Sequence, residues 1–194
     1  MRRRRKGAAL AGRGDTAVTR ERILEVAREQ FATNTYRASS MREIAAELGI
    51  AKPSLYHHFS SKAAILEQLV AAPIDALGAA VDAAAAEPDS DEARRRLLRD
   101  CIAAMVTHQD VMRLLLRDAS IYNDDSTRIV GTVVGTVDRA VAILAGPDAD
   151  WRRRLRAAQA FAAATDPVGH FSDAPGEEFR EALYQGAAAL LDLD

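Results

Sequence analysis

Hydrophobic residues recur every three to four positions through most of this chain, which is the period of an amphipathic α-helix. In the first clear case, over residues 19–31, Ile23, Ala27 and Phe31 form an apolar stripe with charged residues on both sides. The same period predicts helices over residues 41–48, 52–59, 62–87, 91–108, 110–118, 126–145, 150–164 and 177–191. Residues 129–137 are rich in β-branched side chains, but no neighbouring segment offers a strand to pair with them. The pattern therefore predicts an all-α fold, with a kink or a break at Pro73.

Residues 40–59 have the pattern of a helix-turn-helix. Ser40 precedes Glu43 by three positions, which is a capping box at the start of the first short helix. Gly49 then permits the left-handed turn between the two helices, and Ala45 is small where they cross. In this motif the second helix enters the major groove of DNA.

The charge along the chain agrees with a nucleic-acid partner for the first third. Residues 1–62 hold 13 Lys and Arg against 6 Asp and Glu, whereas residues 63–194 hold 13 against 22. A basic segment favours a polyanion, because neutralised phosphates dominate affinity for nucleic acids. Lys52, Ser54 and His57 are expected to reach base edges, while Tyr56 and Lys62 are expected to hold phosphates.

The run from Thr19 to Leu66 resembles the DNA-binding domain of the tetracycline-repressor (TetR) family of bacterial regulators. The block Leu-Tyr-His-His-Phe-Ser-Ser-Lys at 55–62 is its most specific part. The other matching residues are Ile23, Leu24, Ala27, Phe31, Ser39, Ser40, Met41, Ile44, Ala45, Leu48, Gly49, Ile50, Ser54 and Leu66. With the helix-turn-helix at 40–59, the candidate DNA-binding residues are Ser39, Ser40, Arg42, Ala51, Lys52, Pro53, Ser54, Tyr56, His57, His58 and Lys62.

Two positions depart from the family pattern. The family usually has Gly near Thr35, and here Asn34 is expected to adopt the left-handed conformation instead. The family commonly has Ser or Thr at the position of Ala51, and alanine there forfeits roughly 1 kcal/mol of helix capping.

The resemblance implies three parts: a basic and flexible arm over 1–15, the DNA-binding domain over 16–62, and a helical ligand-binding and dimerisation domain over 63–194. It also implies a homodimer formed through the last two long helices, whose small residues either pair with a second copy or pack within one subunit. These residues are Ala157, Ala160, Ala164, Ala182, Gly186 and Ala189. The ligand pocket is expected among Met105, His108, Met112, Tyr122, Phe161 and His170, residues that could equally form plain core.

Several classes of protein do not fit this sequence. A single cysteine, Cys101, excludes a disulfide framework and a multi-cysteine zinc site. We find no catalytic or phosphate-binding motif, no metal-ligand spacing and no sign of a cofactor, so an enzyme is not expected. The longest uncharged run, at 182–191, is too short to cross a membrane, and the basic start is followed by too short an apolar stretch for a signal peptide. We expect a cytoplasmic protein without a membrane partner.

These observations predict a homodimeric, sequence-specific transcriptional repressor. It would bind a pseudo-palindromic operator in double-stranded DNA and be released by a small, mainly apolar effector. Two alternatives stay open at this point: an activator or ligand-independent DNA-binding protein, and a helical enzyme for a small molecule that carries a DNA-binding module.

Overall fold

The computed structural model describes residues 8–123, 128–171, 173–174 and 176–193, and throughout these residues the secondary structure is helical without strands. The all-α prediction is confirmed. The chain divides into two compact units, with the boundary between Leu69 and Val70. The units are described separately.

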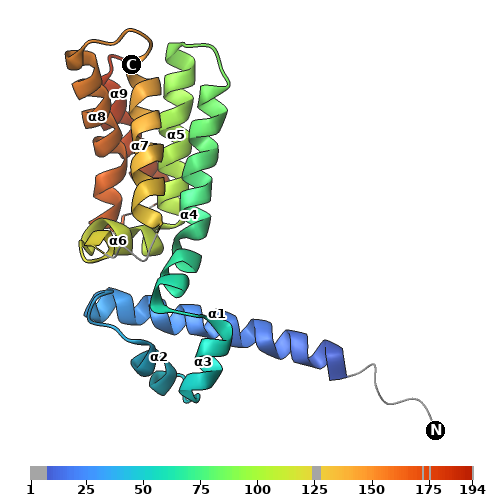
Figure 1. Cartoon of the computed structure of the whole chain (residues 1–194). Helices are drawn as coiled ribbons and strands as arrows, with labels where there is room; N and C mark the ends of the chain where they lie inside the picture. The colour runs from blue at the N-terminus through green and yellow to red at the C-terminus, as the bar shows by residue number, and fades with distance from the viewer. Residues whose placement is uncertain (1–7, 124–127, 172, 175, 194) are drawn as a thin grey trace. The chain divides into compact units, whose positions relative to one another are not determined.

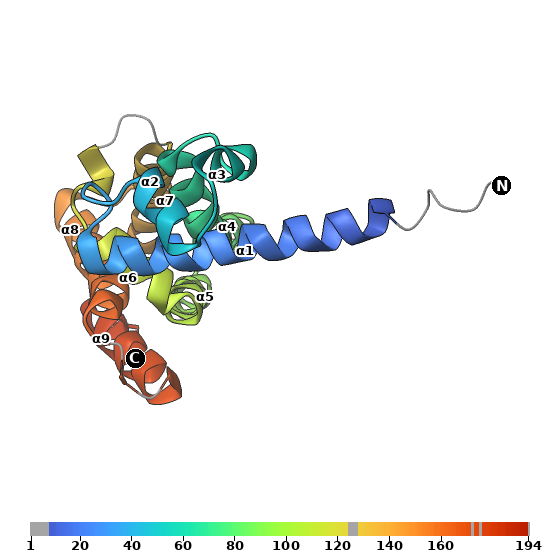
Figure 2. The ribbon, with the colours of Figure 1, turned by 90° about the horizontal axis from the view of Figure 1, so that it is seen from below.

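The first unit contains α1 (Ala8–Asn34), α2 (Met41–Glu47), α3 (Lys52–His58) and the start of α4 (Lys62–Ala85). Figures 1 and 2 both show α2 and α3 on the same side of α1. The predicted stripe is its core, since Ile23 and Ala27 are completely buried and Phe31 is nearly so. Phe31 meets Tyr36 edge to face, with ring centroids 5.2 Å apart.

α1 begins earlier than the sequence predicts. Residues 8–15, expected to belong to a flexible arm, form its first two turns. The rest of the arm, residues 1–7, lies outside the described residues.

The second unit contains the rest of α4, then α5 (Asp91–Thr107), α6 (Gln109–Arg117), α7 (Ile129–Ala145), α8 (Trp151–Thr165) and α9 (Gly176–Leu190), with short 3₁₀ helices η1 (Ile121–Asn123) and η2 (Asp166–Gly169). In Figure 1, α5, α7, α8 and α9 run alongside one another, and α6 lies across one end of this bundle. α8 packs against both α7 and α9, and α5 packs against α9. The buried face of α5 supplies Leu97, Leu98, Cys101 and Ile102 to the core.

The sequence predicts a kink or a break at Pro73; α4 continues through this residue, so the break does not occur. Proline has no N–H, and the helix therefore lacks one bond to the carbonyl of Leu69. α4 is long and apolar enough to cross a membrane. Core helices of water-soluble proteins meet the same criterion of length and composition. Leu66, Val70 and Val81 lie buried along α4.

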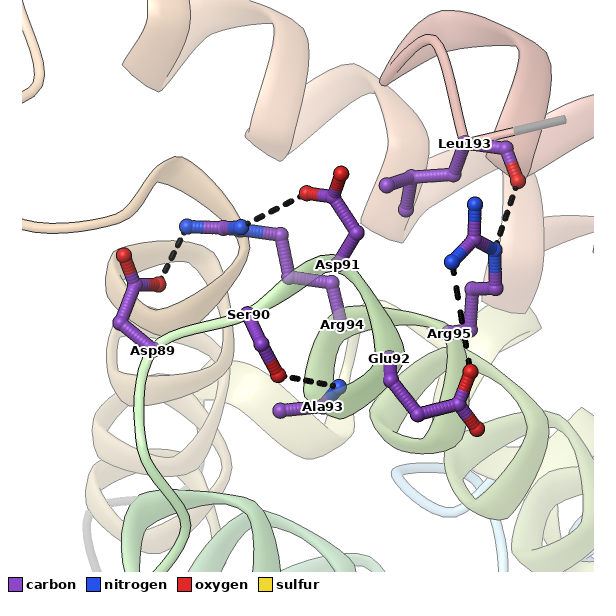
Figure 3. Close-up of polar contacts among 8 residues, drawn as sticks. All are labelled: Asp89, Ser90, Asp91, Glu92, Ala93, Arg94, Arg95 and Leu193. Carbon is purple, nitrogen blue, oxygen red and sulfur yellow. Dashed lines mark hydrogen bonds and ion pairs between the residues drawn. The ribbon is translucent and has the colours of Figure 1, made fainter.

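A buried arginine fixes the turn between α4 and α5 (Figure 3). Arg94 is 7% exposed and pairs with Asp89 and Asp91, the latter at 3.0 Å. Ser90 caps α5 by accepting the N–H of Ala93 at 3.1 Å. At the end of α7, Gly146 has φ +81°, and a Cβ there would lie 2.6 Å from Nη2 of Arg94. The positive φ of Gly146 disfavours any L side chain there, and a Cβ would also displace the end of the Arg94 side chain.

Candidate nucleic-acid interface

The loop between α1 and α2 takes its shape from backbone contacts. The left-handed residue is Thr35, with φ 71°, and not Asn34, so the sequence prediction at this point is wrong. The helix continues through Asn34, which places the reversal one residue later. Ser39 is buried, with its hydroxyl 2.8 Å from the carbonyl of Thr35 and 3.2 Å from that of Gln30. These contacts give Ser39, a candidate DNA-binding residue, a structural role in closing the loop.

Ser40 caps α2 as predicted, but Glu43 reaches back to the Ser40 hydroxyl where a capping box would use the backbone N–H. The Ser40 hydroxyl oxygen accepts the backbone N–H of Glu43 at 3.3 Å, and the hydroxyl donates to the Glu43 carboxylate at 2.7 Å. Met41, Ile44 and Ala45 are the buried residues of this helix. α2 therefore presents its other side, including Arg42, to solvent.

Gly49 makes the turn into α3. Its φ of 67° lies in the left-handed region, where L side chains are disfavoured. The N–H of Ile50 then donates to the carbonyl of Ala45 at 3.0 Å. Ala51 is the N-cap of α3 and makes no side-chain capping bond, as the sequence predicts. Pro53 stands in the first turn, where its missing N–H removes no helical bond.

α3 has one buried position and an exposed outer face. Leu55 is completely buried, while Lys52, Ser54, Tyr56 and His57 are exposed. The Lys52 ammonium lies 5.6 Å from the centroid of the Tyr56 ring, a cation–π distance. This face combines a cation, a hydroxyl and an imidazole, which are groups that read base edges or hold phosphates.

Lys62 differs from the other candidate DNA-binding residues, because its ammonium is directed into the loop between α1 and α2. Nζ donates to the carbonyls of Tyr36 at 2.6 Å and Ser39 at 2.9 Å. It also lies 4.2 Å from the centroid of the Tyr36 ring. Lys62 thus ties the start of α4 to the segment that precedes α2.

Arg20 has a positioning role that the sequence did not reveal. Its guanidinium donates to the carbonyl of His58 at 3.0 Å and to Oε1 of Gln68 at 2.9 Å. It also stacks over Phe59, with Cζ 4.2 Å from the ring centroid. Arg20 therefore holds the end of α3 against α1. The helical period shows only that Arg20 lies on the polar side of α1, so no local signal reveals this contact.

His58 lies at the edge of the exposed face. It is partly buried, and its ring meets that of His57 nearly perpendicularly, with centroids 5.8 Å apart. Within the part of the chain that the structure describes, no group of three or more His, Cys, Asp or Glu side chains could hold a metal ion.

A second candidate site is a cavity of about 270 Å³ in the second unit. Four of the predicted pocket residues line it, namely Met105, Met112, Tyr122 and Phe161. His108 instead lines a separate shallow groove between α4 and α5, and His170 is exposed outside the cavity.

Aliphatic side chains of α4, α6, α7 and α8 complete the cavity, and its polar groups are Tyr122, Thr165 and Asp166. Burial, and then the Asp166 carboxylate, raise the pKa of the Tyr122 phenol, which therefore stays protonated near neutral pH. Thr165 and Asp166 were missed in the sequence, where they read as the end of a helix.

The small residues of α8 and α9 face different surroundings. Ala157, Ala160 and Ala164 of α8 are completely buried within the subunit. Of the α9 residues, Ala182, Gly186 and Ala189 are all exposed. The alternative of packing within one subunit therefore holds for α8, whereas the α9 stripe is open to solvent.

The N-terminal region is similar to known regulators in sequence. A model of the family described as bacterial regulatory proteins, tetR family, matches residues 23–69. The transcriptional regulator UidR of Escherichia coli K12 is 42% identical over 52 residues, which are 27% of this chain and 26% of UidR. The transcriptional repressor KstR2 of Mycobacterium tuberculosis is 39% identical over 62 residues, 32% of this chain and 31% of KstR2. The matched segment thus spans about a quarter to a third of these curated relatives.

Solved structures extend the likeness in fold to the whole chain. AmtR of Mycobacterium smegmatis has a TM-score of 0.74 at 23% identity and covers 100% of this chain and 90% of its own. The structure of KstR2 has a TM-score of 0.65 at 22% identity and covers 90% of this chain and 93% of its own. UidR and KstR2 are both named as regulators of transcription. The chain thus matches the model of the tetR family over its helix-turn-helix segment, residues 23–69, and is similar to these solved structures in fold over its length.

Proposed function

We propose that the protein is a homodimeric, cytoplasmic repressor that binds a pseudo-palindromic operator and releases it on binding a small, mainly apolar molecule. The observation that carries the DNA-binding part is the outer face of α3, which exposes Lys52, Ser54 and His57 around a completely buried Leu55. A recognition helix needs this division between a face held by the core and a face free to enter the major groove.

The exposed residues have two roles in this proposal. Lys52, Ser54 and His57 contact base edges, because lysine donates to guanine and serine can donate or accept. Arg42 and Tyr56 contact phosphates and fix the register of the helix on the duplex. Arg20, Ser39 and Lys62 act indirectly by holding α3 and the preceding loop in place.

The exposed stripe of α9 supports pairing with a second copy. Ala182 and Gly186 lie one helical turn apart, and small side chains let two helix backbones approach closely. Leu155 on α8 is 49% exposed and adds apolar surface. A dimer also meets a requirement of recognition, since two α3 helices one turn of DNA apart read a pseudo-palindrome.

The cavity supports control by a ligand. A molecule that binds one arrangement of the protein preferentially weakens DNA binding by linkage if that arrangement misplaces the two α3 helices. α4 is the covalent path for such coupling, because it carries Lys62 at its first residue and Leu77 in the cavity wall. Pro73 lies between them and removes one helical hydrogen bond.

The test is binding of the purified protein to duplex DNA from upstream of its own gene, beside an unrelated duplex, across a salt series. We expect tight binding of the first duplex with dimer stoichiometry. Lys52→Ala and His57→Ala should change which sequence binds best, and Tyr56→Ala should weaken all sequences alike. Arg139→Ala, which removes an exposed charge from the second unit, is the matched control and should bind normally. Weak and equal binding of both duplexes would contradict the proposal.

Dimerisation has its own test in sedimentation velocity. Gly186→Arg places a bulky charge in the exposed stripe of α9 and should produce monomers that bind operator weakly. Gly135→Arg makes the same substitution at an exposed position of α7 with open space around it, and should leave the dimer intact. A dimer unaffected by Gly186→Arg would exclude this interface.

A further inference from the structure

We propose that the effector is a hydrophobic organic cation, a bulky apolar amine whose ammonium group is bound beside Asp166 at the polar end of the cavity. This inference rests on the proposed function, because it specifies the ligand of the same site. The observation behind it is the sign of the charge around the cavity. One carboxylate lines it, and no Lys, Arg or His is among the described side chains that do so.

The apolar part of the ligand is selected by the cavity walls. Eleven of the lining residues have aliphatic, aromatic hydrocarbon or thioether side chains, drawn from α4, α5, α6, α7 and α8. The cavity volume of about 270 Å³ exceeds the roughly 150 Å³ of an engineered protein cavity that holds benzene. A compact cage or a pair of fused rings therefore has room, and its burial provides most of the affinity.

The polar end selects the sign of the charge. Asp166 is exposed at the start of η2, and no described cation pairs with it. The Thr165 hydroxyl donates to the carbonyl of Phe161 at 2.9 Å, so its proton is already used and its oxygen is left to accept. A ligand carboxylate or phosphate would meet the Asp166 carboxylate without a compensating cation.

Aromatic rings and sulfur atoms in the cavity wall also favour a ligand with an ammonium group. The rings of Tyr122 and Phe161 both line the cavity, and the face of an aromatic ring attracts an ammonium ion. Met105 and Met112 bring polarisable sulfur atoms, which adapt to ligands of different shape. The Tyr122 phenol stays neutral beside Asp166, so it adds no second negative charge and can donate a hydrogen bond.

The test uses three probes with one rigid hydrocarbon cage: 1-adamantylamine, 1-adamantanol and 1-adamantanecarboxylate. Calorimetric titration of the full-length protein at pH 7, without DNA, measures each dissociation constant. We expect the amine to bind about tenfold more tightly than the alcohol, and the carboxylate to bind most weakly. Equal or tighter binding of the carboxylate would overturn the proposal, as would failure of the amine to bind at millimolar concentration.

Substitutions test whether Asp166 is the residue that selects the amine. Asp166→Asn should reduce amine affinity about tenfold, leave the alcohol within twofold and improve the carboxylate. Asp138→Asn is the matched control, because Asp138 is exposed on α7 and follows the lining residue Val137. Ala162→Phe fills the cavity and should weaken all three probes. If Asp166→Asn and Asp138→Asn bind the amine equally, the assignment of Asp166 is wrong.

Because these titrations contain no DNA, they separate this inference from the proposed function. Asp166-dependent amine binding that leaves operator binding unchanged would support the site and contradict release by the ligand. Release by some anionic compound, with no binding of the amine, would support the regulator and refute the cationic effector.

Discussion

Replacing Lys62 by methionine separates two explanations for its role in DNA binding. The side chain could contact a phosphate, as the sequence suggests, or position the helix-turn-helix through the loop between α1 and α2. In the structure its ammonium donates to the carbonyls of Tyr36 and Ser39 at 2.6 and 2.9 Å. A hydrogen bond to a charged group contributes roughly 1.5–3 kcal/mol, and partial exposure reduces this. Lys62→Met keeps the aliphatic length and should cost about 2–3 kcal/mol of unfolding free energy.

The assay is operator affinity measured over a range of salt concentrations, together with urea unfolding. Each phosphate contact contributes about 0.9 to the slope of log K against log salt concentration. Lys62→Met should lower affinity at every salt concentration and leave this slope unchanged, because the loop loosens while no phosphate contact is lost. Arg42→Met is the matched comparison, since Arg42 is exposed on α2 and is assigned to a phosphate, so its loss should reduce the slope without destabilising the domain.

The contrary result is equally distinct. If Lys62→Met unfolds at the wild-type urea concentration and reduces the salt slope as Arg42→Met does, then Lys62 contacts DNA directly. The hydrogen bonds to Tyr36 and Ser39 would then have no energetic importance, and the positioning role assigned here would be refuted.

Three further predictions concern stability and reactivity. Thr35→Gly should stabilise the first unit by about 1 kcal/mol, because the left-handed conformation of a β-branched residue costs more than the extra chain entropy of glycine; an unchanged or lower urea midpoint would contradict this. Gly146→Ala should lower the free energy of unfolding by about 1–3 kcal/mol through its backbone conformation, and further by displacing Arg94. Gly135→Ala, in the open face of α7, should instead raise the urea midpoint slightly. Burial, and then the charge of Asp100, raise the pKa of the Cys101 thiol from 9.0 to about 12. The contribution of the protonated thiol to the free energy of unfolding is therefore complete below pH 9 and is lost as pH rises toward 12. A disulfide reagent at pH 8 should label Cys101 only in urea, and rapid labelling of the folded protein would be the opposing result.

The helix-turn-helix was predictable because its determinants are local in sequence. Ser40 and Glu43 are three residues apart and contact each other within one turn. The left-handed turn needs a glycine, and Gly49 stands at the end of the apolar period of α2. Such signals involve neighbouring residues and backbone conformation, so they can be recognised without knowledge of the rest of the fold.

The contacts that position the motif were not predictable, because they join residues far apart in sequence. Arg20 reaches His58 and Gln68, and Lys62 reaches Tyr36 and Ser39. A polar residue on the outer side of a helix has the same local pattern whether it meets solvent, DNA or a distant carbonyl. The one-residue error at Thr35 is of another kind, since α1 continues through Asn34 and the left-handed residue is the next one.

In the second unit, the helical period of the sequence does not distinguish residues that line the cavity from residues of the core. Met105 and Phe161 line the cavity, while Leu97 and Ile102 of the neighbouring core do not, yet all four follow the same helical period. An apolar wall differs from a core only in whether a facing side chain fills the space, and sequence periodicity carries no information on that. Asp166 is different, because no cation among the described residues pairs with this exposed carboxylate, which is satisfied at the end of apolar walls either by solvent or by a complementary ligand. A charge at the cavity rim is therefore a better guide to the effector than the apolar residues that provide most of its binding surface.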